Sequence, residues 1–363
     1  MSIDAKDAKN PKDTKRGIKP ASSKIFSPLL ALFAILLFNI FLNPGFLSIT
    51  IVNGHLYGQL IDILNRAVPV MILATGMTLV IATAGTDLSC GALLALSGAL
   101  AVSLIRGDST VLNADTAMPF AAVILISLVV TSLCGLWNGF LVAKLGIQPI
   151  VATLIFMTAG RGIAQLITGA RNLTTSYEPF SVIGQGWFLG LPVPLFIAAG
   201  VFLAVWYFAR RTAFGLFVEA VGVNASAARY SGINSSLVIM VVYTISGFCA
   251  GVAGLIYASN IMCADATNAG LNYELDAILA VVLGGTSMMG GRFYLGGTVI
   301  GALIIMALTK SIYAFDVAPE SALVVKAFVV VFVVMIQSPL YRSLRESLRS
   351  RKRKPGSVRE SVG

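Results

Sequence analysis

Apolar runs of about twenty residues follow one another from residue 25 to residue 340, and few charges interrupt them. Hydrophobic residues make up 57% of the chain and charged residues only 12%, whereas about 25% of an ordinary soluble domain is charged. The polar residues are too few to cover the exterior of a soluble globule. The pattern therefore excludes a soluble enzyme, a disordered chain and a disulfide-rich secreted domain. It predicts an all-α, polytopic bundle of membrane helices.

Ten of these runs approach the length of a membrane span, which needs about 20 apolar residues. The eighth run is short and rich in glycine, so it is either a full span or a half-helix. The ten candidates are residues 25–42, 67–84, 88–105, 119–143, 147–169, 191–209, 237–258, 276–290, 294–311 and 321–340.

Basic residues are concentrated in two tails, and this distribution predicts the orientation. Residues 1–24 hold seven Lys and Arg and are expected to form a disordered tail, and residues 342–363 hold eight. With ten spans, both termini are cytoplasmic, and the segments on their side hold 20 of the 26 basic residues while the opposite loops hold four. Residues 25–341 form one membrane domain. Because basic tails beside spans are topology signals, the expected surface partner is the lipid membrane and not nucleic acid.

The chain lacks the residue sets of common catalytic and metal sites. It has one histidine, His55, and four cysteines without a CxxC pair, so we expect no metal site. It has no GxxxxGK[ST] stretch to hold ATP and no GxSxG or HExxH motif. We therefore expect a protein that is not an enzyme and whose function depends on what its helices enclose.

Polar groups inside or beside the predicted spans are the candidates for a translocation pathway. Arg161 lies within the fifth span, where a buried charge costs at least about 2.5–3.5 kcal/mol, so it either faces the interior or extends to the surface. We expect it to support the bundle through carbonyl groups. The loop 259–275 offers acceptors for sugar hydroxyls, although a hydrated loop or a partner surface explains it as well. The pathway candidates are Asp87, Asn138, Arg161, Asp265, Glu274 and Asp276.

Residues 210–236 form the longest loop expected between spans on the side of the tails. The stretch EAVGVNASAARYSGI combines helix formers with glycines, which predicts a short helix at the membrane surface. Such a helix either docks on a soluble partner or is an ordinary surface helix.

Glycine patterns predict how the spans pack. Residues 80–100 and 281–303 share an apolar run, a glycine-rich turn and a helix of small residues, which is either an internal repeat or two independent hairpins. Pairs spaced by four residues predict close helix contacts at Gly135/Gly139, Gly247/Gly251 and Gly297/Gly301.

Four motifs, spread over about residues 60–335, resemble those of monosaccharide permeases of ABC importers, the ribose/galactofuranose type. The likeness is greatest to galactofuranose-type permeases, and mild departures occur at Ala84, Thr86, Cys90, Ile150 and Phe293, the last of which stands where many members have Gly. The motifs are TAGTDLSCGALLALSG, GLWNGFLVAKLGIQPIVATLIFMTAGRGIAQLITG, EAVGVNASAARYSGIN and ADATNAGLNYELDAILAVVLGGTSMMGGRF.

The resemblance implies a non-catalytic permease subunit of the bacterial inner membrane, for galactofuranose-like sugars or a pentose such as arabinose or ribose. This chain would bind no cofactor, because ATP and Mg belong to a separate ABC ATPase subunit that docks on the coupling loop 210–236. A periplasmic sugar-binding protein and a second permease chain, identical or related, would complete the transporter. The coupling residues implied by the motif are Glu219, Ala220, Gly222, Asn224, Ala227, Ala228 and Gly232.

A secondary transporter of a small polar solute, driven by an ion gradient, is the alternative. It would share the hydropathy and the broken helices. It would normally need ion-coordinating groups in the middle of the membrane, and only Arg161 stands out there. A membrane enzyme is a third class, but the sequence offers it no nucleophile and base.

Overall fold

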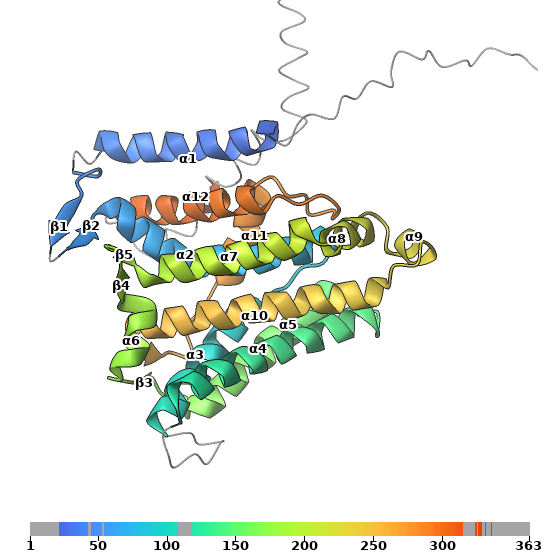
Figure 1. Ribbon diagram of the computed structural model, residues 1–363, viewed down its shortest axis with the longest axis horizontal. Coiled ribbons are helices and arrows are strands. Elements are labelled where there is room, and N and C mark those ends of the chain that lie inside the picture. Colours follow the sequence, from blue (N-terminus) through green and yellow to red (C-terminus); the bar gives the residue numbers. More distant parts are fainter. Residues whose placement is uncertain are drawn as a thin grey trace, which may run out of the picture.

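The computed structural model describes residues 22–42, 45–52, 54–107 and 118–314, together with six positions between 324 and 335. Within these ranges the chain is a bundle of helices with short strands gathered at one end and α8 and α9 at the other (Figure 1). The helices are α1 (Ser22–Leu42), α2 (Gln59–Ala82), α3 (Cys90–Arg106), α4 (Phe120–Ala143), α5 (Pro149–Thr168), α6 (Glu178–Gln185), α7 (Val193–Arg211), α8 (Phe214–Val223), α9 (Ala225–Tyr230), α10 (Ser235–Ile261), α11 (Tyr273–Leu283) and α12 (Leu295–Ala314).

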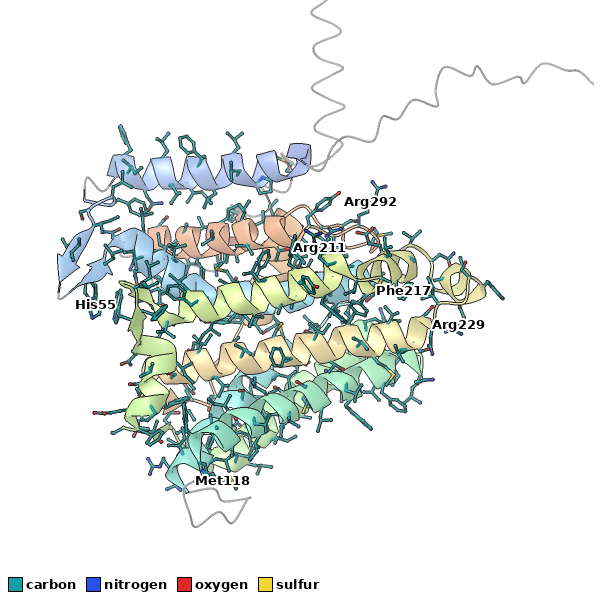
Figure 2. The ribbon with its side chains drawn as sticks, in the orientation of Figure 1. His55, Met118, Arg211, Phe217, Arg229 and Arg292 are labelled. Atoms are coloured by element: carbon teal, nitrogen blue, oxygen red, sulfur yellow. The ribbon has the colours of Figure 1, made fainter. Side chains whose placement is uncertain are left out.

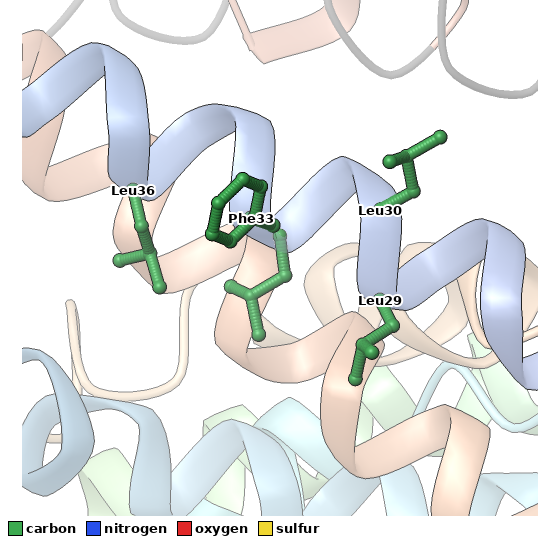
Figure 3. Close-up of a pocket in the computed structure, with 5 residues that line it drawn as sticks. Leu29, Leu30, Phe33 and Leu36 are labelled. Atoms are coloured by element: carbon green, nitrogen blue, oxygen red, sulfur yellow. The ribbon is translucent and has the colours of Figure 1, made fainter.

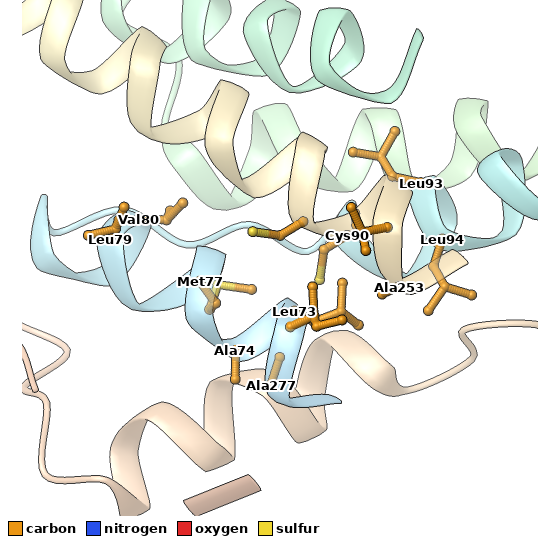
Figure 4. Packing of buried hydrophobic residues seen from close by; sticks show 14 of the residues in the cluster. Leu73, Ala74, Met77, Leu79, Val80, Cys90, Leu93, Leu94, Ala253 and Ala277 are labelled. Atoms are coloured by element: carbon orange, nitrogen blue, oxygen red, sulfur yellow. The ribbon is translucent and has the colours of Figure 1, made fainter. Parts of the chain in front are cut away.

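The core of the bundle is built on α2, α3 and α10. Every residue of α3 from Cys90 to Ile105 is buried, as is most of α2 from Ala67 to Ala82, because these helices are apolar on all sides. Figure 4 shows Leu73 of α2 and Leu93 of α3 within this cluster. By contrast, α4, α5 and α7 bury only a minor part of their length and expose apolar side chains. Such outer faces suit contact with lipid.

Glycine pairs set the closest helix contacts, as their spacing predicted. Gly135 and Gly139 of α4 face α10, where a Cβ on Gly135 would overlap the Tyr243 carbonyl oxygen and lie 3.1 Å from the Gly247 Cα. Gly251 likewise faces α4, and Gly297 and Gly301 of α12 pack against Gly284 and Ala280 after and within α11. The predicted close packing is confirmed at all three pairs.

Six helices in the described residues are long and apolar enough to cross a membrane: α2, α4, α5, α7, α10 and residues Leu295–Tyr313 of α12. They correspond to the predicted spans 67–84, 119–143, 147–169, 191–209, 237–258 and 294–311. The predicted spans 25–42 and 88–105 form α1 and α3, whose apolar stretches are shorter. Most of the span 321–340 lies outside the described residues, as do almost all of tail 1–24 and all of tail 342–363. The total of ten spans therefore stays a prediction.

The predicted second span starts too late, because α2 begins at Gln59 rather than at residue 67. An ion pair one helical turn apart supports these first turns: the Nε of Arg66 lies 2.8 Å from an Oδ of Asp62. Asp62 also pairs with Lys310 near the end of α12, so the two helices are tied at the strand end of the bundle.

The eighth candidate span, residues 276–290, is a short helix rather than a full crossing. With 11 residues, α11 is about 16 Å long, and the hydrocarbon core is about 30 Å thick. The helix stops because a glycine-rich turn follows, in which Gly285, Gly290 and Gly291 have positive φ. Its other end lies inside the bundle, where a Cβ on Gly91 of α3 would overlap the Glu274 carboxylate. The half-helix alternative therefore describes this segment.

In the described part of the chain, six short strands, which the all-α prediction did not include, pair at one end of the bundle. The stacked rings of His55 and Trp187, whose centroids are 4.9 Å apart, join two of the hairpins. The pairs are β1 (Thr50–Val52) with β2 (His55–Tyr57), β3 (Leu173–Thr174) with β6 (Cys263–Ala264), and β4 (Trp187–Phe188) with β5 (Leu191–Pro192), all antiparallel.

Candidate functional site

Asp87 lies fully buried in the connection between α2 and α3. Its Oδ1 accepts hydrogen bonds from the Ser89 backbone N–H at 3.0 Å and from the Ser89 hydroxyl at 2.6 Å. Its Oδ2 accepts one from the Ser246 hydroxyl of α10 at 2.7 Å. These bonds fix the chain just before α3 in an Asx turn and tie that helix to α10.

Asn138 of α4 belongs to the same buried network. Its Nδ2 donates to the Ser89 hydroxyl at 2.8 Å, so two of the predicted pathway residues, Asp87 and Asn138, are joined through one serine. The Oδ1 of Asn138 is buried and has no hydrogen-bond partner among the described residues. The network is enclosed by helices, and it holds the break between α2 and α3 in place.

Arg161 of α5 holds the loop between α10 and α11. Its Nη1 donates to the backbone oxygen of Thr267 at 2.7 Å and to that of Ala269 at 3.2 Å. The expected bonding of Arg161 to carbonyl groups is confirmed. The guanidinium thus fixes the point at which the chain leaves the strand end and turns toward the interior of the bundle.

Asp265 follows β6 directly and organises the same loop. Its Oδ1 accepts from the backbone N–H groups of Asn268 at 2.9 Å and Thr267 at 3.1 Å, and its Oδ2 accepts from the Asn268 amide at 3.0 Å. Partial burial by itself raises the pKa of Asp265. The hydrogen bonds from Asn268 and Thr267 and the charge of Arg161 outweigh it and lower the pKa below its ordinary value. The structure therefore brings Arg161 and Asp265 to one loop.

The two acidic residues of α11 lie in different surroundings. The Glu274 carboxylate is 5% exposed and lies next to Gly91, at the start of α3. Both Asp276 oxygens accept from the Lys326 Nζ at 3.0 Å, in a pair that is largely shielded from solvent. This pair joins residues 50 positions apart, and it could not be predicted from the sequence because no local pattern links them. Asp276 is thus separate from the Asp87 and Arg161 groups.

The predicted surface helix is present, as α8 and α9 with Asn224 between them. The Asn224 side chain accepts from the Ala227 N–H at 2.9 Å and caps α9. A Cβ on Gly222 would overlap the Ala82 carbonyl oxygen and lie 2.6 Å from the Gly291 nitrogen. Gly222 and the buried Ala228 therefore face the helix bundle and not the outer surface of the loop. Gly232 has a φ of +85°, which allows the turn before α10.

The outer surface of this loop is formed by residues that the motif did not single out. Leu216, Val223 and Tyr230 are 70%, 78% and 93% exposed. Figure 2 shows Phe217 and Arg229 at the same end of the molecule. These exposed residues could have been predicted from the sequence, because large apolar residues in a loop outside the membrane indicate a contact surface. Glu219 and Ala220 are half-buried, and Ala227 is exposed.

A hollow on α1 is of a different kind. Its lining is formed by five apolar side chains of that helix, four of which Figure 3 labels. These side chains offer no hydrogen-bonding group to a sugar, so the hollow suits lipid or an apolar helix. The lining residues are Leu29, Leu30, Leu32, Phe33 and Leu36.

Comparison with known proteins defines the class to which this arrangement belongs. Residues 59–334 match the family described as branched-chain amino acid transport system / permease component, and the chain belongs to that family. The helical breaks, the half-helix and the surface loop 210–236 are therefore parts of a membrane permease. No solved structure matches the chain.

The curated relatives of the chain are permeases of sugar transporters. The galactofuranose transporter permease protein YtfT of Escherichia coli (strain K12) is 48% identical over 89% of this chain and 92% of its own length. The fructose import permease protein FruF of Bifidobacterium longum is 39% identical, over 83% of each chain. The ribose import permease protein RbsC of Escherichia coli (strain K12) is 37% identical over 85% of this chain and 92% of its own length. The resemblance inferred from the four motifs is confirmed.

Proposed function

We propose that the chain is the membrane permease subunit of an ABC importer for a monosaccharide, with a galactofuranose-like sugar as the first candidate. The observation that carries this proposal is the 48% identity, over 89% of the chain, to a galactofuranose transporter permease. Relatives named for ribose and fructose are less similar, at 37–39% identity. A pentose such as ribose or arabinose is the second candidate.

In the proposed topology the chain crosses the bacterial inner membrane ten times, and α8 and α9 lie on the cytoplasmic side. The start of α1 points toward the α8 end of the bundle, which supports placing the first tail there (Figure 1). The loop after α10 enters from the strand end, and α11 continues to the α8 end, where Gly291 contacts Ala82. The loop and the half-helix together therefore make one crossing of the membrane. The number of crossings stays even, so both termini lie on the same side.

The proposed partners follow from the two ends of the bundle. An ABC ATPase subunit, which binds ATP and Mg, contacts the exposed face of α8 and α9 through Leu216, Val223 and Tyr230. A periplasmic sugar-binding protein delivers the sugar at the strand end, and a second permease chain completes the pathway. ATP binding to the ATPase pair favours one of two permease conformations, so the side on which the path is open alternates.

The proposed pathway runs along the loop that follows α10. Asp265, Asn268 and Glu274 supply acceptors for sugar hydroxyls, and Arg161 fixes the loop that carries them. Asp87, Asn138 and Asp276 act behind this surface by holding α3, α4 and α11 in register.

The test is reconstitution of the tagged full chain with its ATPase and binding protein in liposomes. We expect ATP hydrolysis that rises with the loaded binding protein, and ATP-dependent uptake of radiolabelled galactose above that of ribose or arabinose. Uptake that follows a proton or sodium gradient without ATP would instead establish a secondary transporter.

A matched pair of substitutions tests the ATPase surface. Val223→Asp and Tyr230→Asp place a charge on the exposed face of the loop and should prevent recovery of the ATPase on the tagged permease. Leu189→Asp changes a side chain that is 80% exposed at the strand end and should leave recovery unchanged. Normal ATPase recovery with both loop variants contradicts the proposed contact.

A further inference from the structure

Three segments that are distant in sequence meet at the base of α8. The Gly291 N–H, in the turn after α11, donates to the carbonyl oxygen of Ala82 at the end of α2, at 2.8 Å. Gly222 of α8 packs on that same carbonyl oxygen and on the Gly291 nitrogen, so closely that a Cβ would overlap them. All three contacts are made by backbone atoms, so no side chain can rotate to absorb a displacement of α8.

Arg210, in the last turn of α7, binds two of these segments at once. Its Nη2 donates to the Phe293 backbone oxygen at 2.5 Å, and its guanidinium carbon lies 4.5 Å from the centroid of the Phe293 ring. Its Nη1 lies 3.4 Å from an Oε1 of Glu219 on α8. Phe293 is fully buried, so the guanidinium rests on a fixed ring beside the turn.

The three contacts of Arg210 need a guanidinium. The pair with Glu219 alone would add little, since both side chains are partly exposed. A planar group with several donors can stack on a ring while it bonds a carbonyl and a carboxylate in different directions, whereas an ammonium group cannot do all three. Arg210 therefore links α8 to the turn 284–294 more firmly than a simple surface ion pair would.

We propose that Arg210 is a positioning residue that makes α8 and the turn 284–294 move as one body. A displacement of α8 then reaches α11, which ends directly before the turn and carries Glu274 in its first turn, inside the bundle. It also reaches the end of α2, which leads into the connection that contains Asp87. This inference rests on the proposed function, in which the ATPase displaces α8.

The test uses the full chain assembled with its ATPase, with the four native cysteines replaced and one reporter cysteine at a time. Met289→Cys reports on the turn, where the native side chain is 85% exposed, and Ser226→Cys reports on the exposed surface of α9. The rate of maleimide labelling is measured with and without a non-hydrolysable ATP analogue. The variants are Arg210→Gln and Arg210→Lys, and Arg211→Gln is the matched control, because Arg211 lies 5.8 Å from the ring of Trp206 instead.

We expect the ATPase to protect position 226 in every background, and the nucleotide to change labelling at position 289 in the parent and in Arg211→Gln. In Arg210→Gln this nucleotide response at 289 should be lost, so that labelling proceeds at the same rate with and without the analogue. Arg210→Lys keeps the charge near Glu219 but loses the stacked guanidinium, so its response should also fall.

Each other outcome is decisive. A nucleotide response at 289 that persists in Arg210→Gln overturns the inference, as does a parent protein in which 289 never responds. Failure of both Arg210 variants to fold assigns the residue a role in stability and also overturns it. If the ATPase does not protect position 226 even in the parent, the proposed function fails first, and the two failures are thereby distinguished.

Discussion

Replacement of Gly247 by alanine tests whether α4 and α10 touch through their backbones. A Cβ at this position would overlap the Thr131 carbonyl oxygen and lie 3.0 Å from the Gly135 Cα. Since all of these atoms belong to helix backbone, the methyl group can be accommodated only if the two helices move apart. The helices would separate beside Ser246, whose hydroxyl holds Asp87.

The expected magnitude combines two opposing effects. Insertion of a methyl group into a tightly packed contact costs about 1–3 kcal/mol. Alanine favours the helix by about 1 kcal/mol relative to glycine, which offsets part of that cost. We therefore expect a net loss of up to about 2 kcal/mol for Gly247→Ala. Gly200→Ala on α7 is the matched control, because open space surrounds that Cβ position and only the gain in helix propensity applies.

The assay is thermal unfolding of the purified full chain in detergent. By the scale of soluble proteins, each kcal/mol shifts the midpoint by about 2–4 °C in a domain of about 150–250 residues, and by less in a longer chain such as this one. Gly247→Ala should therefore unfold a few degrees below the parent, and Gly200→Ala at or above it. Equal midpoints for the two variants would refute the backbone contact between α4 and α10.

Three further predictions concern buried bonds and orientation. Asp87→Ala leaves buried donors without an acceptor, at about 1–3 kcal/mol for each, so size-exclusion chromatography should recover less assembled protein than for Asp87→Asn. Arg161→Ala frees the loop after α10 and should also reduce assembly; normal assembly with loss of transport alone would show that Arg161 serves the sugar instead. In spheroplasts, an impermeant thiol reagent should label Asn268→Cys but not Ser226→Cys, and equal labelling would contradict the proposed topology.

Helix positions could be predicted where composition alone determines them. The apolar run 119–143 became α4, Phe120–Ala143, because a lipid-facing helix has no other means to satisfy its backbone than its own hydrogen bonds. The glycine pairs were also readable from sequence, since a spacing of four puts both residues on one helix face. Predictions from local patterns, such as the position of α4 and the close contacts at the glycine pairs, are therefore confirmed by the structure.

Contacts between distant residues could not be predicted in this way. The pair of Asp276 with Lys326 spans 50 positions, and the bond between Asp87 and Ser246 spans 159. Which acidic group meets which donor depends on how the helices pack, and local sequence patterns do not reveal that packing. The length of α11 was uncertain for the same reason, because a glycine-rich end fits either a full span or a half-helix.

In the surface loop 210–236, some residues build the shape of the loop and others form its exposed face. A sequence motif does not distinguish the two. Gly222 and Ala228 face the bundle, and Asn224 caps α9, so these motif positions build the shape of the loop. Val223 and Tyr230 lie within the same stretch but are not among the coupling residues implied by the motif, and they occupy the exposed face. The shape of the loop depends on the first group of residues, whereas contact with a partner depends on the second. We therefore expect substitutions at the motif positions to destabilise the loop, and substitutions at the exposed positions to alter which ATPase it binds.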